Sequence, residues 1–356
     1  MHNLFVCHSQ AHITLAVGLA KGRFKADSNH FILFQDFALQ ENIKEAILDT
    51  FDAVMIRTGI YPDINATWKA KIKRYPQDIK AINGFMNQEY KKVFVVCDGN
   101  IPELYILKKA LKLNKSVEMI WLEDGSYPYY QNIIANDGLN ANSFTRLLRK
   151  VFFRYILNLG SIYDFEGNFM GGNKNLKQAY ITFKGYERSL FKNKEIVAIE
   201  KNEYLLGLTT LFKAPENLIK DNSILLVLDK LDTYLNITSV KKMIAELLKH
   251  ALESNINFYY KYHPREEDAL SELAGNNAIT ELKKHFAVEY YYSSAAGKDI
   301  KVVGIKSTGL QSAKMLNFNA ISAAGVVGEA DKDILGFYSK IGVHTPNSLE
   351  GLMSKI

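Results

Sequence analysis

The chain has 356 residues, of which 47% are hydrophobic and 23% charged, and its formal net charge is +6 at pH 7. This composition is that of an ordinary soluble protein, and no apolar run approaches the ~18 residues that a membrane-spanning helix needs. The length is too great for one typical core, so we expect about two domains. The excess of basic residues favours an anionic partner.

The two cysteines, Cys7 and Cys97, lie within apolar runs that have the pattern of strands. Buried free thiols in a reducing compartment fit this pattern better than a disulfide framework does. The chain begins without the basic flank and apolar region of a signal peptide. We therefore expect a cytoplasmic protein.

The first half of the chain alternates short apolar runs with helical patterns. Strands are expected at residues 4–7, 30–34, 53–56, 93–97 and 117–122, and helices at residues 11–21 and 103–113. This alternation is typical of βαβ units that share a parallel sheet. Residues 143–215 have a weaker pattern, in which a Gly-rich turn precedes two short strands near residues 179–183 and 196–199.

The second half repeats this alternation, with strands expected at residues 224–228, 257–262 and 302–305. Residues 240–252 carry apolar side chains at the spacing of an amphipathic helix. We predict an α/β protein of the GT-B type, with two Rossmann-like domains, 1–205 and 206–356, facing each other across a cleft. Several binding-protein folds share this layout, and the C-terminal segment is a candidate to cross back.

Two acids and a glycine, Glu123, Asp124 and Gly125, end the strand pattern of residues 117–122. Acids do not continue a buried strand, so the pair should lie at the carboxyl end of one, where open α/β sheets bind ligands. The acids could supply a general base and a neighbour that holds its charge, or they could cap the next segment.

A histidine ends one strand pattern of the second half. His263 precedes Pro264, which restricts the histidine backbone to the extended region and so fixes the direction of the ring. Such a ring can protonate or hydrogen-bond a leaving phosphate, although a capping or core histidine is the simpler interpretation. Lys261, two residues earlier, would favour an anion there.

Hydroxyl groups follow another strand of the second half. Ser307 and Thr308 precede Gly309 at an expected helix start, where hydroxyls and free backbone N–H groups either form a phosphate site or cap the helix. A D-x-D pattern at residues 331–333 has low specificity, and no cluster with metal-ligand spacing accompanies the acids, so we expect no metal requirement.

Two stretches concentrate positive charge. Residues 68–75 include Lys69, Lys71, Lys73 and Arg74, and the second stretch covers residues 146–154. Either could be the solvated face of a helix, or it could contact a membrane surface, a polyanionic glycan or nucleic acid. Nucleic acid is the weakest of these alternatives, because neither stretch contains a recognisable reading motif.

The acid-acid-Gly, His-Pro and Ser-Thr clusters occur in an order that resembles one family group. It is similar to the bacterial sialyltransferases that carry D/E-D/E-G, HP and S-S/T motifs. The amino-acid sequence at residues 4–10, 261–265 and 304–308 looks more like that of the capsular polysialyltransferases than that of the related lipooligosaccharide sialyltransferases. Residues 229–230 depart from the Ser-Gln type of loop expected near the nucleotide.

The resemblance implies an inverting, metal-independent sialyltransferase without a cofactor, which moves sialic acid from CMP-sialic acid to a sialylated or polysialic acid acceptor. It implies that the first domain binds the acceptor and the second the donor. Glu123 would take the acceptor proton and His263 would donate to the leaving CMP phosphate, which Ser307 and Thr308 would hold. The implied acceptor or cleft residues are Gly125, Ser9, Gln10, Asn100 and the four basic residues of the first stretch.

Three alternatives stay open at this point. The acceptor could be the terminal galactoside of a lipooligosaccharide, or the chain could be a capsule or wall polymer phosphotransferase. It could also be a two-domain protein that binds a sugar or nucleotide without catalysis. A capsule enzyme could further associate with the inner face of the bacterial inner membrane or with a capsule complex.

Overall fold

The computed structural model describes residues 2–35, 37–59, 68–130, 147–148, 150–163, 170–212, 218–274, 279–329 and 331–356. The chain divides into two compact units, Met1–Leu211 and Phe212–Ile356. Each unit is built on a parallel β-sheet that is flanked by helices, so the predicted α/β class is confirmed. The expected boundary between residues 205 and 206 lies inside helix α6 (Lys201–Leu211), which packs on α1 (Gln10–Lys21) within unit 1.

The sheet of unit 1 has the strand order β3-β2-β1-β4-β5-β6-β7. Its strands are β1 (His2–Cys7), β2 (Ser28–Gln35), β3 (Ala53–Thr58), β4 (Tyr90–Val95), β5 (Glu118–Leu122), β6 (Gln178–Ile181) and β7 (Glu195–Ala198). All neighbouring pairs are parallel. The strand order reverses between β1 and β4, and such a switch point is where doubly wound sheets bind ligands.

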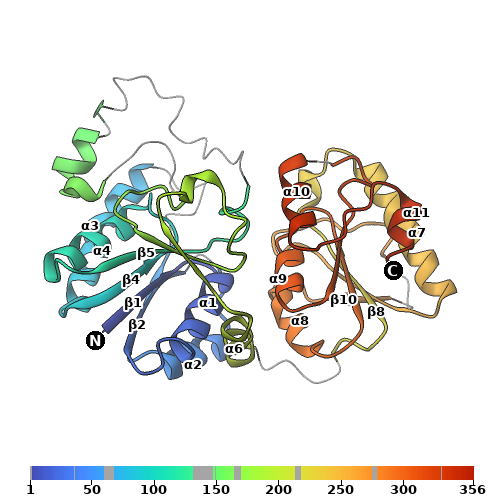
Figure 1. Ribbon diagram of the computed structural model, residues 1–356, viewed down its shortest axis with the longest axis horizontal. Coiled ribbons are helices and arrows are strands. Elements are labelled where there is room, and N and C mark those ends of the chain that lie inside the picture. Colours follow the sequence, from blue (N-terminus) through green and yellow to red (C-terminus); the bar gives the residue numbers. More distant parts are fainter. Residues whose placement is uncertain are drawn as a thin grey trace. The chain divides into compact units, whose positions relative to one another are not determined.

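Helices cover both faces of this sheet. Figure 1 shows α1, α2 and α6 on one side and α3 and α4 on the other. Other helices in the described part of unit 1 are α2 (Glu41–Thr50), α3 (Trp68–Phe85) and α4 (Ile101–Leu113), with short helical turns at Phe152–Ile156, Gly160–Ile162 and Ser189–Phe191. Proline lies in the first turn of α4, as expected for a residue without a backbone N–H.

The sheet of unit 2 has the order β10-β9-β8-β11-β12, and all of its pairs are parallel. Its strands are β8 (Ser223–Val227), β9 (Asn257–Lys261), β10 (Ile279–Leu282), β11 (Ile300–Gly304) and β12 (Asn319–Ser322). Its helices are α7 (Ile237–Glu253), α8 (Val288–Ser294), α9 (Gly309–Met315), α10 (Lys332–Lys340) and α11 (Leu349–Met353), with a helical turn at Leu231–Thr233. Here the strand order reverses between β8 and β11.

The strands expected from the sequence are all present, but two strands of unit 2 were not predicted. The segments β10 and β12 are each four residues long and form the two edges of the sheet. In β10 the two central residues are exposed polar ones, so the strand lacks the apolar run that marks the buried strands. The chain from β12 to its last residue belongs to unit 2.

Helices α1 and α6 cross with their backbones in close approach. A methyl group added at Gly18 would lie 2.1 Å from the carbonyl oxygen of Glu203, and one at Gly207 would lie 2.1 Å from that of Thr14. Arg23 reinforces the crossing, because its guanidinium donates to both carboxylate oxygens of Glu203 at 2.8 and 2.9 Å. None of the helices in the described ranges combines the length and apolar character that crossing a bilayer requires.

We predict that Gly18→Ala lowers the free energy of unfolding by about 1–3 kcal/mol, because the methyl group must displace the backbone of α6. Gly84→Ala is the matched control, since Gly84 is exposed in α3 and a methyl group there would meet open space. That change should raise the free energy of unfolding by about 0.5–1 kcal/mol, through helix propensity. If urea denaturation showed that both changes alter the free energy of unfolding by the same amount, the result would contradict the close crossing.

Candidate functional site

The acid pair stands where the sequence predicted it, directly after β5. The backbone N–H of Glu123 donates to the carbonyl of Tyr180 at 3.0 Å, which ties the pair to the end of β6. Gly125 then takes a φ of +52°, a left-handed conformation that glycine adopts without strain. The two carboxylates therefore lie at the carboxyl edge of the unit 1 sheet.

Glu123 is buried, with 5% of the residue exposed, and hydrogen-bond donors surround its carboxylate. The hydroxyl of Tyr129 donates to Oε2 at 2.6 Å, and the hydroxyl of Thr182 lies 2.9 Å from both oxygens. The backbone N–H of Thr182 also donates to Oε2. Burial raises the pKa of Glu123 to about 7, since these hydrogen bonds offset only part of the desolvation and the charge of Asp124 adds to it.

Asp124 has a different environment. Its side chain is 30% exposed, and its Oδ1 lies 2.8 Å from Nε2 of the buried His12. Burial by itself would raise the pKa of Asp124, but the N–H group of His12 and the nearby imidazole of His8 hold that pKa below its usual value. The two neighbouring acids thus differ in protonation near neutral pH, which is a common property of catalytic carboxylate pairs.

Two further buried carboxylates, which the sequence analysis missed, lie at the same edge. Glu103, in the first turn of α4, pairs with Nε2 of His8 and accepts the backbone N–H of Cys97 at 2.7 Å. Asp98 follows β4 and accepts the backbone N–H groups of Gly171 and Asn173 at 3.0 and 2.6 Å. Burial raises the pKa of Asp98 to about 7 and also raises that of Glu103.

In unit 2, His263 follows β9 as predicted. Its Nδ1 accepts the backbone N–H of Arg265 at 3.1 Å, so the ring proton of the neutral form lies on Nε2. Burial lowers the pKa of His263, and the charges of Lys261 and Arg265 lower it further. At neutral pH the ring is therefore a neutral donor through Nε2–H.

Ser307 and Thr308 follow β11 at the same edge of unit 2. Ser307 is half-buried and its Oγ accepts the backbone N–H of Gly309 at 3.3 Å, whereas Thr308 is exposed and its side chain does not cap α9. Asp229, after β8, accepts the backbone N–H of Lys306 at 3.0 Å and so fixes this turn at the switch point. The simple N-capping alternative is therefore wrong for Thr308.

The other residues predicted to bind the donor substrate differ in accessibility. Pro264 is exposed, next to His263. Lys261 is 3% exposed, and its Nζ donates to the carbonyl oxygens of Tyr262 and Lys284 at 3.1 and 3.2 Å. Burial lowers the pKa of Lys261 to about 8. Its ammonium group thus holds two loops together at the edge of the sheet.

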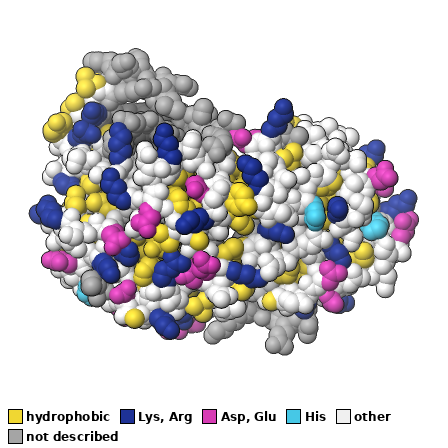
Figure 2. Space-filling view, in the orientation of Figure 1, with side chains coloured by type: hydrophobic (Ala, Val, Ile, Leu, Met, Phe, Trp, Pro, Cys, Tyr) yellow, Lys and Arg dark blue, Asp and Glu magenta, His cyan; other side chains and the backbone are white. Residues whose placement is uncertain are grey.

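The residues of unit 1 that were predicted to contact the acceptor substrate lie in different structural settings. Ser9 caps α1, Gln10 is the first residue of that helix, and Asn100 precedes α4. Lys73 is exposed, whereas Arg74 donates to Asp78 at 3.2 Å. The side chains of Lys69 and Lys71 lie outside the described residues. Among the described residues in view, Figure 2 shows basic side chains interspersed with acidic ones.

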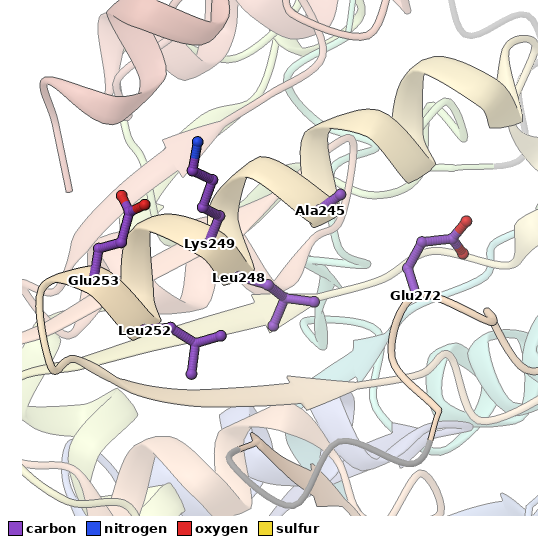
Figure 3. Close-up of a pocket in the computed structure, with 6 residues that line it drawn as sticks. All are labelled: Ala245, Leu248, Lys249, Leu252, Glu253 and Glu272. Atoms are coloured by element: carbon purple, nitrogen blue, oxygen red, sulfur yellow. The ribbon is translucent and has the colours of Figure 1, made fainter.

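A shallow hollow on unit 2 contains none of the predicted site residues. Its lining, shown in Figure 3, comes from α7 and the loop after β9: Ala245, Leu248, Lys249, Leu252, Glu253 and Glu272. Among the residues that the structure describes, no three His, Cys, Asp or Glu side chains are placed to hold a metal ion. In the D-x-D pattern, Asp331 caps α10 by accepting the backbone N–H groups of Asp333 and Ile334.

A match to a known protein family includes the predicted site residues of both units. A family model described as alpha-2,8-polysialyltransferase matches residues 3–322. No curated protein matches the chain by sequence. The matched range includes both acids, His263 and the Ser307–Thr308 pair.

Solved structures share the fold at low sequence identity. The UDP-GlcNAc 2-epimerase of Methanocaldococcus jannaschii is 13% identical, with a TM-score of 0.60 over 100% of this chain and 91% of that chain. The Neisseria meningitidis UDP-GlcNAc 2-epimerase is 11% identical, with a TM-score of 0.56 over 100% and 98%. A Photobacterium phosphoreum alpha/beta-galactoside alpha-2,3-sialyltransferase is 13% identical, with a TM-score of 0.49 over 87% of each chain. The epimerase similarities confirm the predicted GT-B type of fold.

We predict that the protonation of Glu123 affects stability in a defined pH range. The pKa of about 7 lies above the ordinary value of 4.5, so between these values the native state keeps a proton that the unfolded chain releases. The free energy of unfolding therefore falls as the pH rises from ~4.5 to ~7. Glu123→Gln removes this fall, and the variant should gain about 1–3 kcal/mol relative to wild type between pH 5 and pH 8 in urea denaturation.

Glu118→Gln is the control for this comparison, because Glu118 begins the same strand but its side chain is 36% exposed and ion-paired with Lys92. The control shows how the loss of a carboxylate outside the buried site changes the free energy of unfolding over the same pH range. A pH-independent difference for Glu123→Gln would show that Glu123 ionises like a surface acid.

Proposed function

We propose, since the chain belongs to the alpha-2,8-polysialyltransferase family, that it transfers sialic acid from CMP-sialic acid to a sialylated or polysialic acid acceptor. The observation that carries the proposal is the carboxyl group of Glu123, which has a pKa of about 7 at the carboxyl edge of the unit 1 sheet. A group that titrates near the working pH is well suited to take a proton from an acceptor hydroxyl. The transfer inverts the anomeric carbon and needs no metal.

In this reaction the acceptor oxygen forms a bond to the anomeric carbon while the bond from that carbon to the phosphate oxygen breaks. The electron pair of the broken bond leaves with CMP, and the proton of the acceptor hydroxyl passes to Glu123. Asp124 stays ionised beside it. The donors around the carboxylate, Tyr129 and Thr182, hold it in one orientation.

Unit 2 supplies the groups for the departing phosphate. The Nε2–H of His263 donates to a phosphate oxygen as negative charge develops there, and the hydroxyls of Ser307 and Thr308 add further donors. The support for this role is the tautomer that the backbone N–H of Arg265 imposes on the ring. Stabilisation of charge that develops in the transition state is often the largest single contribution to catalysis.

The first test is the release of CMP from CMP-sialic acid by the purified protein in the presence of EDTA. Oligosialic acid should stimulate the release more than a lactose glycoside does. Glu123→Gln and His263→Ala should each lower kcat by about 10²–10⁴-fold, the range for loss of a general acid or base. If the wild-type protein shows no turnover and a variant only loses affinity for CMP-sialic acid, the chain would be a binding protein.

Two matched variants complete the comparison. Glu118→Gln and His250→Ala change the same residue types away from the predicted site, on β5 and α7, and should keep wild-type turnover. Preference for lactose would favour the lipooligosaccharide type of acceptor. The absence of turnover with every acceptor would overturn the sialyltransferase proposal, and loss of activity in EDTA would overturn metal independence.

We also propose peripheral binding to the inner face of an anionic membrane. Residues 147–156 contain large apolar side chains that are 44% to 76% exposed: Leu147, Leu148, Val151, Tyr155 and Ile156. Lys150 is exposed among them and Arg154 is half-buried. Exposed apolar groups with basic neighbours are suited to the surface of an anionic bilayer.

Replacing Tyr155 and Ile156 together by serine should therefore reduce co-flotation with vesicles that contain anionic phospholipid by several-fold, because less apolar area can enter the bilayer. The control is Leu235→Ser, an 86% exposed apolar residue of unit 2 without such a cluster. Wild-type protein that does not float with these vesicles would contradict membrane binding without affecting the proposed reaction.

A further inference from the structure

The ring of His12 is held in one tautomer by the backbone of its own turn. Its Nδ1 accepts the backbone N–H groups of His8 at 3.3 Å and of Ser9 at 3.2 Å. Because that lone pair is occupied, the ring proton lies on Nε2. The β1–α1 turn thus aims one N–H donor in a fixed direction.

The start of α1 fixes the position of this ring. Ser9 is the N-cap, and its Oγ accepts the backbone N–H of His12 at 3.3 Å, while the ring accepts the backbone N–H of Ser9 in return. This reciprocal arrangement is a capping box in which histidine replaces the usual glutamate or glutamine. His12 is 4% exposed, so packing restrains it as well.

The fixed donor points at one member of the acid pair. Nε2 of His12 lies 2.8 Å from Oδ1 of Asp124, a residue 112 positions later in the chain. The described residues provide no comparable N–H donor to Oδ2 of Asp124, whereas Glu123 receives its hydrogen bonds from Tyr129 and Thr182. Each acid of the pair therefore has its own set of donors.

We propose that His12 is a positioning residue that keeps Asp124 a carboxylate, so that the proton taken up by the acid pair during transfer resides on Glu123. This inference rests on the proposed function, and it assigns the base within the pair. Without such a bias, either of the two adjacent acids could take up the proton, and neither would be a defined acceptor for the substrate hydroxyl.

The charged and titratable groups around the pair are consistent with this assignment. Asp124 faces His12 and His8, and its charge also acts on Cys97. Glu123 faces Asp124 and Tyr129, and His12 lies near the buried Glu103, which pairs with His8. His12 is the group among these that joins the β1–α1 turn to the acid pair by a hydrogen bond.

The experiment compares wild type with His12→Phe, which fills the same space without a donor, and with His12→Gln, which keeps an N–H. The pH profile of kcat/KM for CMP release should have its acidic limb shifted upward by about one pH unit in His12→Phe, because the singly protonated pair can then place its proton on Asp124 and the doubly ionised pair forms at higher pH. His12→Gln should lie closer to wild type.

Arg23→Met controls for loss of stability, because it weakens the attachment of α1 to α6 without touching the site. It should lower the thermal midpoint and leave the acidic limb unchanged. An unchanged limb in a folded His12→Phe variant, or an equal shift in Arg23→Met, would overturn the proposal.

A readout that does not need turnover separates this inference from the proposed function. The ¹³C carboxyl shift of Asp124, followed by NMR against pH, should show its titration at higher pH in His12→Phe than in wild type. In an Asp124→Asn background, adding His12→Phe should leave the titration of Glu123 unchanged, since the two changes act through one contact. Identical Asp124 titrations would overturn the role of His12, whereas a shifted titration in an inactive enzyme would overturn only the sialyl transfer.

Discussion

Three buried carboxylates and one partly exposed carboxylate at one edge of the unit 1 sheet are the constraint on which the rest of this unit depends. Asp98, Glu103, Glu123 and Asp124 lie after β4, in α4 and after β5, and an unpaired buried charge is costly. Each carboxylate therefore needs donors, and the donors come from other segments: the histidines of the β1–α1 turn, Thr182 after β6, and the backbone around Gly171. These hydrogen bonds and ion pairs hold the loops together at the polar edge.

Helix α1 connects this edge to the body of unit 1. Its first turn carries His12, whereas its later turns pack on α6 through the close approach at Gly18 and Gly207. One helix therefore contributes both to the packing of unit 1 and to the polar edge.

The sequence predicted the features that depend on local pattern. The apolar runs gave the buried strands, and the acid pair, His263 and the Ser307–Thr308 pair stand at strand ends because polar residues interrupt those runs. It did not predict His8, His12, Glu103 or Thr182, because each belongs to the site only through a hydrogen bond to a residue 59 to 112 positions away. A usable signal existed for His8 and Asp98, which directly follow apolar strand patterns just as Glu123 does. His12 carried no such signal, because a histidine inside a helical pattern resembles any other core position.

His12 and His263 share one local hydrogen-bond pattern but have different proposed roles. His12 and His263 both use Nδ1 to accept backbone N–H groups, so both present Nε2–H. In unit 1 that donor meets a carboxylate and decides which acid is free to accept a proton. In unit 2 it follows a strand end where hydroxyls and a lowered imidazole pKa favour a neutral donor. Glu123 thus lies at the edge of one sheet and the His263 donor at the edge of the other. The proposed displacement uses the first to remove a proton from the nucleophile and the second to stabilise the departing charge.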